Sequence, residues 1–207
     1  MKAIIKEYLT GCLTIPNLLS LIRIALIPVF AVLFVDGNYL WAVIVLAISG
    51  LTDFFDGKIA RKFNQISALG KLLDPIADKL SQMTIAVVFY LTFKNSVDAT
   101  VRAFSWIFLV FIIKEAVMVV GGAIMIAFGI KPVAAEMPGK IATFAFYTIM
   151  CVVMAFGPDI GILGNIWTLP APAMLVLVGI SVILTLVAFF SYVPGVLQQI
   201  KEKKNSK

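Results

Sequence analysis

The stretch that decides both the fold and the chemistry of this chain is DFFDGKIARKFNQISALGKLLDPIAD, residues 53–78. It holds four aspartates, Asp53, Asp56, Asp74 and Asp78, in a chain that is 61% hydrophobic and only 14% charged. A charged aspartate at membrane depth costs about 3 kcal/mol even on lenient insertion scales. Four such residues in one short stretch therefore indicate a functional site.

The rest of the sequence predicts an all-α integral membrane protein. Soluble domains carry roughly a quarter charged residues, whereas here the mean hydropathy is +1.05 and the charges form short clusters between long apolar runs. A run of about 20 apolar residues is long enough for a helix to cross the bilayer. Six transmembrane helices are predicted, at residues 17–36, 39–60, 69–93, 102–128, 139–157 and 171–197.

The two ends of the chain flank this bundle. In residues 1–13, Ile4, Tyr8 and Cys12 recur at helical spacing, which predicts an amphipathic helix on the membrane surface. Pro16 is expected to end that helix and Asn17 to cap the first span. We expect one membrane domain over residues 1–207, with the six-helix bundle at 14–198 and a basic tail at 199–207.

The distribution of lysine and arginine predicts the orientation. If the N-terminus lies inside, most basic residues fall in inner segments, and only Lys94 and Arg102 fall in outer loops. Positive residues favour the cytoplasmic side of a cell membrane. Both termini and the segment around residues 60–70 are therefore expected to be cytoplasmic. The lysines of the tail are expected to attract lipid, and no nucleic-acid partner is predicted.

The chain contains no histidine and two distant cysteines, Cys12 and Cys151. Histidine acid–base chemistry and histidine-ligated metals are therefore excluded. The cysteine spacing matches neither a metal knuckle nor a disulfide framework. Catalysis would have to use carboxylates, lysines, arginines and hydroxyls.

The spacing of the four aspartates predicts that they converge. Asp53 and Asp56 are three residues apart at the end of the second span, and Asp74 and Asp78 are four apart near the start of the third. Each pair shares one face of its helix. Two helices joined by a short connection run antiparallel as neighbours, so both pairs can face one gap at the inner membrane surface.

Converging carboxylates need compensating positive charge. Without it they repel one another and raise each other's pKa values. Oxygen ligands at this density suit Mg²⁺, Mn²⁺ or Ca²⁺, and one or two ions would neutralise most of the cluster. Gly57 and Gly70 leave room for a ligand to approach the backbone. The alternative is that the aspartates only cap helices and pair with nearby basic residues.

At this point the pattern resembles the signature of the CDP-alcohol phosphotransferase (CDP-alcohol phosphatidyltransferase) family. The first span, TIPNLLSLIRIALIP, also resembles the opening of glycerophospholipid-synthesising members. The eight positions that match the signature are Asp53, Asp56, Gly57, Ala60, Arg61, Gly70, Asp74 and Asp78.

The resemblance implies a role for each matching residue. A pair of divalent ions, Mg²⁺ or Mn²⁺, is expected on the four aspartates, and Asp78 is also expected to be the general base. It further implies phosphatidyl transfer from CDP-diacylglycerol to a hydroxyl group, with release of CMP. The expected nucleotide-binding residues are Asp56, Gly57, Ala60, Arg61 and Gly70.

The acceptor is harder to predict. In the family, basic residues on later helices select it, and the candidates here are Lys114 and Lys140. Lys114 could instead pair with its neighbour Glu115, but adjacent residues on a helix point apart, which favours a functional role. Phosphatidylglycerophosphate synthases typically carry further cations where this chain has Gly122 and Ala142.

Two acceptors therefore stay open. Glycerol 3-phosphate, the acceptor of phosphatidylglycerophosphate synthases, is the first expectation. The stretch NQISALG looks more like the CMP-forming cardiolipin synthases, which use phosphatidylglycerol. Inositol, serine and choline are less supported. The resemblance also suggests a homodimer, for which the run VVGGAIM in the fourth span could supply a packing face.

Other classes of membrane protein explain the pattern less well. A divalent-metal transporter would place its acidic residues nearer the membrane midplane, on broken helices. A membrane prenyltransferase also binds diphosphates with Mg²⁺, but it would leave Gly57 and the Ala60–Arg61 element unexplained. A purely structural scaffold would need none of the four aspartates.

Overall fold

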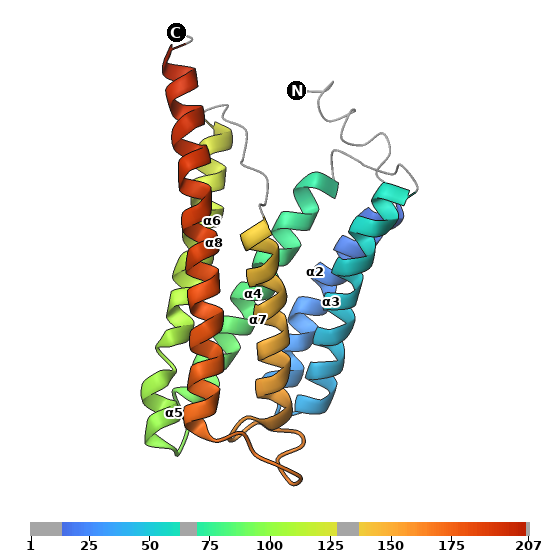
Figure 1. Cartoon of the computed structure of the whole chain (residues 1–207). Coiled ribbons are helices and arrows are strands. Elements are labelled where there is room, and N and C mark those ends of the chain that lie inside the picture. Colours follow the sequence, from blue (N-terminus) through green and yellow to red (C-terminus); the bar gives the residue numbers. More distant parts are fainter. Residues whose placement is uncertain (1–13, 63–69, 128–136, 206–207) are drawn as a thin grey trace. The chain divides into compact units, whose positions relative to one another are not determined.

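The computed structural model describes residues 14–62, 70–127 and 137–205, and all of its regular elements over these residues are helices (Figure 1). Side chains are described within those ranges except at positions 16, 53–62, 71, 72, 126, 127, 202, 204 and 205. The predicted surface helix at 1–13 lies outside the described residues. The helices are α2 (Ile15–Val35), α3 (Tyr39–Lys62), α4 (Gly70–Phe93), α5 (Ala99–Phe104), α6 (Ile107–Ala127), α7 (Met137–Phe156) and α8 (Ala171–Asn205).

The all-α membrane fold is confirmed. Five helical stretches of the described residues are long and apolar enough to cross a membrane, and α3 contributes a shorter apolar stretch over Tyr39–Thr52. The chain divides into two compact units, residues 1–88 and 89–207, with the division inside α4. The first unit contains α2, α3 and most of α4, and the second contains α5 to α8. The single domain over 1–207 stays a prediction.

The start of α2 corrects one prediction. Its N-cap is Thr14, whose hydroxyl accepts a hydrogen bond from the Asn17 backbone N–H at 3.3 Å. Asn17 is therefore not the cap, and Pro16 lies inside the first turn of α2. The prediction that Pro16 ends the preceding helix concerns residues outside the described ones. Proline is tolerated in a first turn because the first N–H groups of a helix have no intrahelical acceptor. Asn17 is instead buried, with only 1% of its surface exposed.

A tight turn sets α3 against α2. Gly37 has a φ of +77°, and the Asn38 backbone N–H donates to the Leu33 carbonyl at 2.9 Å. This is the pattern of a helix C-terminus closed by a glycine in the left-handed region. The chain thus reverses within a few residues, and α2 and α3 pack side by side (Figure 1).

The core of the first unit is built around two phenylalanines of α2. Phe30 and Phe34 are 4% and 1% exposed, and their ring centroids are 5.7 Å apart. The Phe34 ring also meets the Tyr39 ring edge-on at 5.2 Å. Ala42 and Leu46 of α3 are buried too. The core of this unit thus combines large aromatic side chains from α2 with smaller aliphatic ones from α3.

The fourth predicted span, 102–128, is divided into α5 and α6. Asp98 caps α5 by accepting from the backbone N–H groups of Val101 and Thr100, and these bonds hold the pKa of Asp98 below its usual value. At the break, the Phe108 N–H donates to the Ser105 carbonyl at 3.1 Å, three residues earlier. Such tight turns commonly join short helical segments. The hydropathy pattern does not register this break because both segments are apolar.

A chain of aromatic rings forms the core of the second unit. Phe89 and Phe93 contact Phe108 with centroid separations of 5.5 and 5.8 Å. The chain continues from Phe108 to Phe111 at 6.3 Å and on to Phe146 of α7 at 4.9 Å. These five rings are at most 1% exposed. Tilted and edge-on pairs of this kind add to the gain from burial alone, and they tie α6 to α7.

The last helix is longer than the predicted span. It runs from Ala171 to Asn205, so most of the residues predicted to form a separate basic tail continue α8 (Figure 1). At 1.5 Å per residue, a helix of this length reaches roughly 50 Å, well beyond a hydrocarbon core about 30 Å thick. The basic end of α8 therefore continues the same helix beyond the length needed to cross the membrane.

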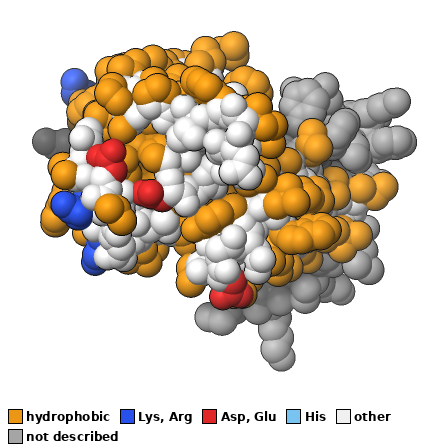
Figure 2. All heavy atoms as spheres, turned by 90° about the horizontal axis from the view of Figure 1, so that it is seen from below, with side chains coloured by type: hydrophobic (Ala, Val, Ile, Leu, Met, Phe, Trp, Pro, Cys, Tyr) orange, Lys and Arg blue, Asp and Glu red, His pale blue; other side chains and the backbone are white. Residues whose placement is uncertain are grey.

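The described surface fits a lipid environment. Many large hydrophobic side chains along the helices are exposed, among them Val120 and Val176 at 57% and 61%. Figure 2 looks onto the ends of the helices from below, and acidic and basic side chains are few among its coloured atoms. The three tryptophans, Trp41, Trp106 and Trp167, lie at or beside helix ends and are 60%, 64% and 53% exposed. Exposed tryptophans at helix ends are typical of the membrane–water interface.

Candidate active site

Half of the predicted site lies on α3, outside the described side chains. The helix extends through Lys62 and therefore carries the backbone of this half. The positions concerned are Asp53, Asp56, Gly57, Ala60 and Arg61. Their assignments as metal and nucleotide ligands stay predictions.

The other half lies at the start of α4 and is described. Gly70 is the first residue of α4 and is buried. Asp74 and Asp78 follow on the same helix, one turn apart, and both are partly buried. The predicted sharing of one helix face by these two residues is confirmed by the continuous helix from Gly70 to Phe93.

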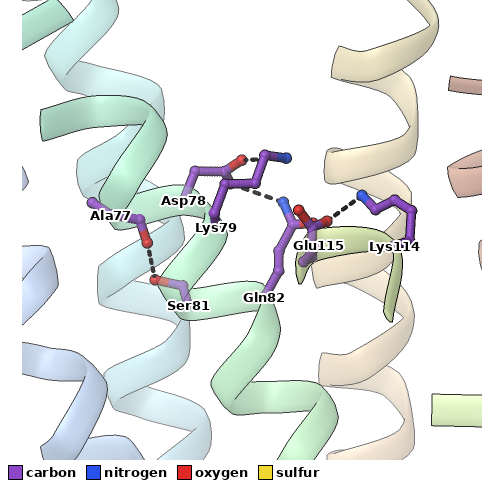
Figure 3. A network of polar contacts seen from close by, with 7 residues as sticks. All are labelled: Ala77, Asp78, Lys79, Ser81, Gln82, Lys114 and Glu115. Atoms are coloured by element: carbon purple, nitrogen blue, oxygen red, sulfur yellow. Dashed lines mark hydrogen bonds and ion pairs between the residues drawn. The ribbon is translucent and has the colours of Figure 1, made fainter. Parts of the chain in front are cut away.

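Asp78 is held by two neighbours on its own helix. The side-chain amide of Gln82, one turn later, donates to Oδ1 of Asp78 at 2.9 Å (Figure 3). Lys79 places its Nζ 3.5 Å from Oδ2 of the same carboxylate. Gln82 is only 4% exposed, whereas about a fifth of each of the Asp78 and Lys79 side chains is exposed. Asp78 is therefore fixed on one side and reachable from outside on another.

Asp74 is held from a different helix. The hydroxyl of Ser20 on α2 donates a short hydrogen bond to Oδ1 of Asp74. Ser20 is fully buried, so this bond is shielded from water. It brings α2 into the site, for which the sequence had indicated only the second and third spans.

The described carboxylates fit one half of a divalent-cation site. Among the residues whose placement is described, no three acidic, histidine or cysteine side chains gather closely enough to hold a metal. Asp74 and Asp78 by themselves offer oxygen ligands one helical turn apart. Oxygen is the ligand type that Mg²⁺ and Mn²⁺ prefer. The predicted metal site also includes Asp53 and Asp56, whose side chains are not described. The metal site therefore stays a prediction, and the described half is compatible with it.

The candidate acceptor residues lie in the second unit, and Lys114 corrects one argument. Its Nζ forms a close ion pair with Oε1 of Glu115, the adjacent residue on α6 (Figure 3). The expectation that these neighbours point apart is wrong for this pair. Both side chains are long and flexible, and the attraction between opposite charges is strong where little water reaches them. The Glu115 side chain is fully buried and that of Lys114 is 11% exposed.

Lys140 is exposed in the first turn of α7. Beside it, Gly139 packs against Tyr192 of α8: a Cβ at this position would lie 2.6 Å from the Tyr192 hydroxyl. The glycine therefore allows a close approach of the two helices next to Lys140. The roles of Lys114 and Lys140 in acceptor binding stay predictions.

Sequence reasoning missed Ser20 and Gln82, which hold the two aspartates of α4. The signal in the sequence was a set of polar residues within an apolar span. Ser20 belongs to a series of buried polar residues in an apolar span, Asn17, Ser20 and Arg23, which are at most 1% exposed. Residues three apart share one helix face, so this series could have been identified as a functional face.

The model of the CDP-alcohol phosphatidyltransferase family matches residues 13–191 of the chain. Among curated proteins, the chain is 40% identical over 141 residues to a protein of Streptomyces coelicolor named cardiolipin synthase (CMP-forming). The match covers 64% of this chain and 60% of that protein. The chain thus spans about three-fifths of the length of this relative.

Two further relatives carry the two enzyme names considered above. A Rickettsia typhi protein named CDP-diacylglycerol–glycerol-3-phosphate 3-phosphatidyltransferase is 42% identical over 87 residues, which are 41% of this chain and 48% of that protein. A human protein named cardiolipin synthase (CMP-forming) is 53% identical over 68 residues, which are 32% of this chain and 23% of that protein.

Proposed function

Because the chain belongs to the CDP-alcohol phosphatidyltransferase family, we propose that it moves a phosphatidyl group from CDP-diacylglycerol to the hydroxyl of a glycerol-type acceptor and releases CMP. The observation that carries the proposal is the pair Asp74 and Asp78, one turn apart at the start of a helix of membrane-spanning length. Carboxylates at that position suit a reaction between a lipid-linked diphosphate and a hydroxyl at the membrane surface.

The proposed reaction exchanges one bond to phosphorus for another. The acceptor oxygen bonds to the phosphorus that carries diacylglycerol, the bond from this phosphorus to the CMP oxygen breaks, and Asp78 takes the proton of the acceptor hydroxyl. The exposed part of the Asp78 carboxylate is available to a substrate, and Gln82 keeps it in place. A positioned carboxylate of this kind contributes about 10²–10⁴-fold as a general base.

The α3 half of the motif would complete the site. Mg²⁺ or Mn²⁺ on Asp53, Asp56, Asp74 and Asp78 would neutralise charge on the diphosphate. The nucleotide would lie against the remaining motif residues, where Arg61 supplies a positive charge and the glycines permit close approach. The proposed nucleotide-binding residues are Asp56, Gly57, Ala60, Arg61 and Gly70.

Two acceptors are candidates, and one observation favours the second. Glycerol 3-phosphate carries a phosphate monoester with nearly two negative charges near neutral pH, whereas phosphatidylglycerol carries a diester with one. A small dianion is best bound by several uncompensated cations. Lys114 is already paired with the buried Glu115, and Gly122 and Ala142 carry no charge. This arrangement favours phosphatidylglycerol, so that the product would be cardiolipin.

We further propose that the site and both termini lie on the cytoplasmic side of the cell membrane. The support is the concentration of lysine and arginine in the segments on that side. A homodimer is also proposed. In α6, a Cβ added at Gly121 or Gly122 would have no neighbour within 4 Å, so a second transmembrane helix could approach closely there.

The test is a CMP-release assay on the purified protein in detergent, with CDP-diacylglycerol and Mg²⁺ or Mn²⁺. Glycerol 3-phosphate, phosphatidylglycerol, inositol, serine and choline are supplied in separate reactions. We expect CMP with phosphatidylglycerol, and release with glycerol 3-phosphate instead would support the first acceptor. Absence of CMP in every reaction would overturn the enzymatic proposal. Uptake of Mn²⁺ into proteoliposomes would then support the divalent-metal transporter.

A further inference from the structure

Three polar residues of α2 form a buried face. Asn17, Ser20 and Arg23 recur every three residues and are at most 1% exposed, although they lie within a helix of membrane-spanning length. Polar and ionisable groups are expensive inside a membrane span, and they usually face the interior of the bundle, where they mark a functional site. Apolar residues would fill this face at lower cost.

The middle residue of this face contacts one of the motif aspartates. The hydroxyl of Ser20 donates to Oδ1 of Asp74, across 54 positions of sequence and from α2 to α4 within the first unit. A hydrogen bond to an ionised carboxylate is roughly twice as strong as one between neutral groups. The bond restricts the rotation of the Asp74 side chain about its two torsions.

We propose that Ser20 is a positioning residue for Asp74, and that α2 thereby contributes to the active site together with α3 and α4. The inference rests on the proposed function, in which Asp74 is a metal ligand. With Oδ1 engaged by Ser20, the other oxygen of the carboxylate would be left to bind a cation. Partners that orient a metal ligand in this way typically account for about 10–100-fold in metal affinity or activity.

The two aspartates of α4 are held in the same manner. Each accepts a hydrogen bond on Oδ1 from a neutral, buried side chain, Ser20 for Asp74 and Gln82 for Asp78. Neutral donors orient a carboxylate without cancelling its charge. For Asp78 the nearby Lys79 compensates part of the charge, so this argument applies most directly to Asp74. This shared arrangement supports an orienting role for Ser20 over a purely structural one.

Another serine provides a matched control. Ser81 of α4 is 4% exposed, but its hydroxyl donates to the Ala77 carbonyl of its own helix at 2.8 Å (Figure 3). Removing that hydroxyl deletes a buried polar group in the same unit without taking a donor away from Asp74. A change seen at Ser20 but not at Ser81 therefore reports on Asp74.

The experiment compares Ser20→Val with Ser20→Thr, which have nearly the same size and differ by the hydroxyl. Binding of Mn²⁺ to each full-length protein in detergent is measured by electron paramagnetic resonance, without substrate, and CMP release is then measured against Mn²⁺ concentration. We expect Ser20→Val to weaken Mn²⁺ binding about tenfold or more. Ser20→Thr and Ser81→Ala should bind as the wild type does.

Two results would overturn the inference. One is wild-type Mn²⁺ affinity in Ser20→Val, and the other is equal weakening in Ser20→Thr, which would indicate packing instead of the hydroxyl. If Ser20→Val does not fold, the smaller change Ser20→Ala takes its place, with the same expectation. The wild-type protein separates this inference from the proposed function: if it releases CMP, a negative result at Ser20 counts against the inference alone.

Discussion

The side-chain amide of Gln82 donates a 2.9 Å hydrogen bond to Oδ1 of Asp78, one turn earlier on α4. Gln82 is almost completely buried while Asp78 remains partly exposed. The bond therefore connects a buried side chain to a carboxylate that a substrate can reach. If Asp78 is the general base, its partner should matter to turnover.

Replacing Gln82 tests this relationship. Gln82→Met keeps the length of the side chain but removes the donor. We expect kcat to fall about 10–100-fold, since a hydrogen bond to a charged group is worth about 1.5–3 kcal/mol. The KM for CDP-diacylglycerol should change little. Steady-state CMP release measures both, and Gln82→Asn, whose donor cannot reach as far, should be impaired as well. An unchanged kcat in Gln82→Met would show that Asp78 does not depend on this bond.

Asp78 itself gives the sharpest test of the proposed chemistry. Asp78→Asn preserves the shape of the side chain but cannot take a proton, so we expect turnover to fall by about 10²–10⁴-fold. Binding of a cytidine nucleotide should be largely kept, which isothermal titration with CMP and Mg²⁺ can measure. Wild-type turnover in this variant would rule out Asp78 as the base.

The effects of Lys114 and Glu115 on protein stability should depend on each other, because the two side chains form an ion pair. Breaking a buried ion pair from one side commonly costs about 3–5 kcal/mol, whereas replacing both partners by apolar residues can be nearly neutral. We therefore expect Glu115→Leu to lower the thermal melting temperature in detergent more than the double variant Lys114→Met/Glu115→Leu does. Equal loss in the two variants would mean that the pair contributes no mutual stabilisation.

A side chain at Gly139 should force the Tyr192 ring to move, because an added Cβ would lie 2.6 Å from the Tyr192 hydroxyl. We expect Gly139→Ala to destabilise the protein by about 1–3 kcal/mol, the usual cost of overpacking. Adding Tyr192→Phe removes the colliding atom and should recover much of the loss in melting temperature. If the second change gives no recovery, contact with the hydroxyl is not the cause.

Much of the fold followed from local sequence patterns. Hydropathy located the apolar helices because the length of a membrane span is set by the thickness of the bilayer. The spacing of Asp74 and Asp78 correctly placed them on one helix, since a helical turn has a fixed period. Where two local signals competed, the prediction was less accurate. Thr14, not Asn17, caps α2, and the turn at Ser105 divides a span that hydropathy presents as continuous.

The positions of the helices and the acidic face of α4 are thus properties of the sequence by itself, because they depend on the polarity and spacing of neighbouring residues. Only the tertiary structure decided that Ser20 bonds to Asp74, because those residues lie 54 positions apart and meet through the packing of α2 and α4. It also decided that Lys114 pairs with Glu115, because long side chains can bend toward each other in surroundings that exclude water. Helical periodicity sets the face of the helix from which a side chain projects. The packing around that side chain determines which partner its polar group contacts.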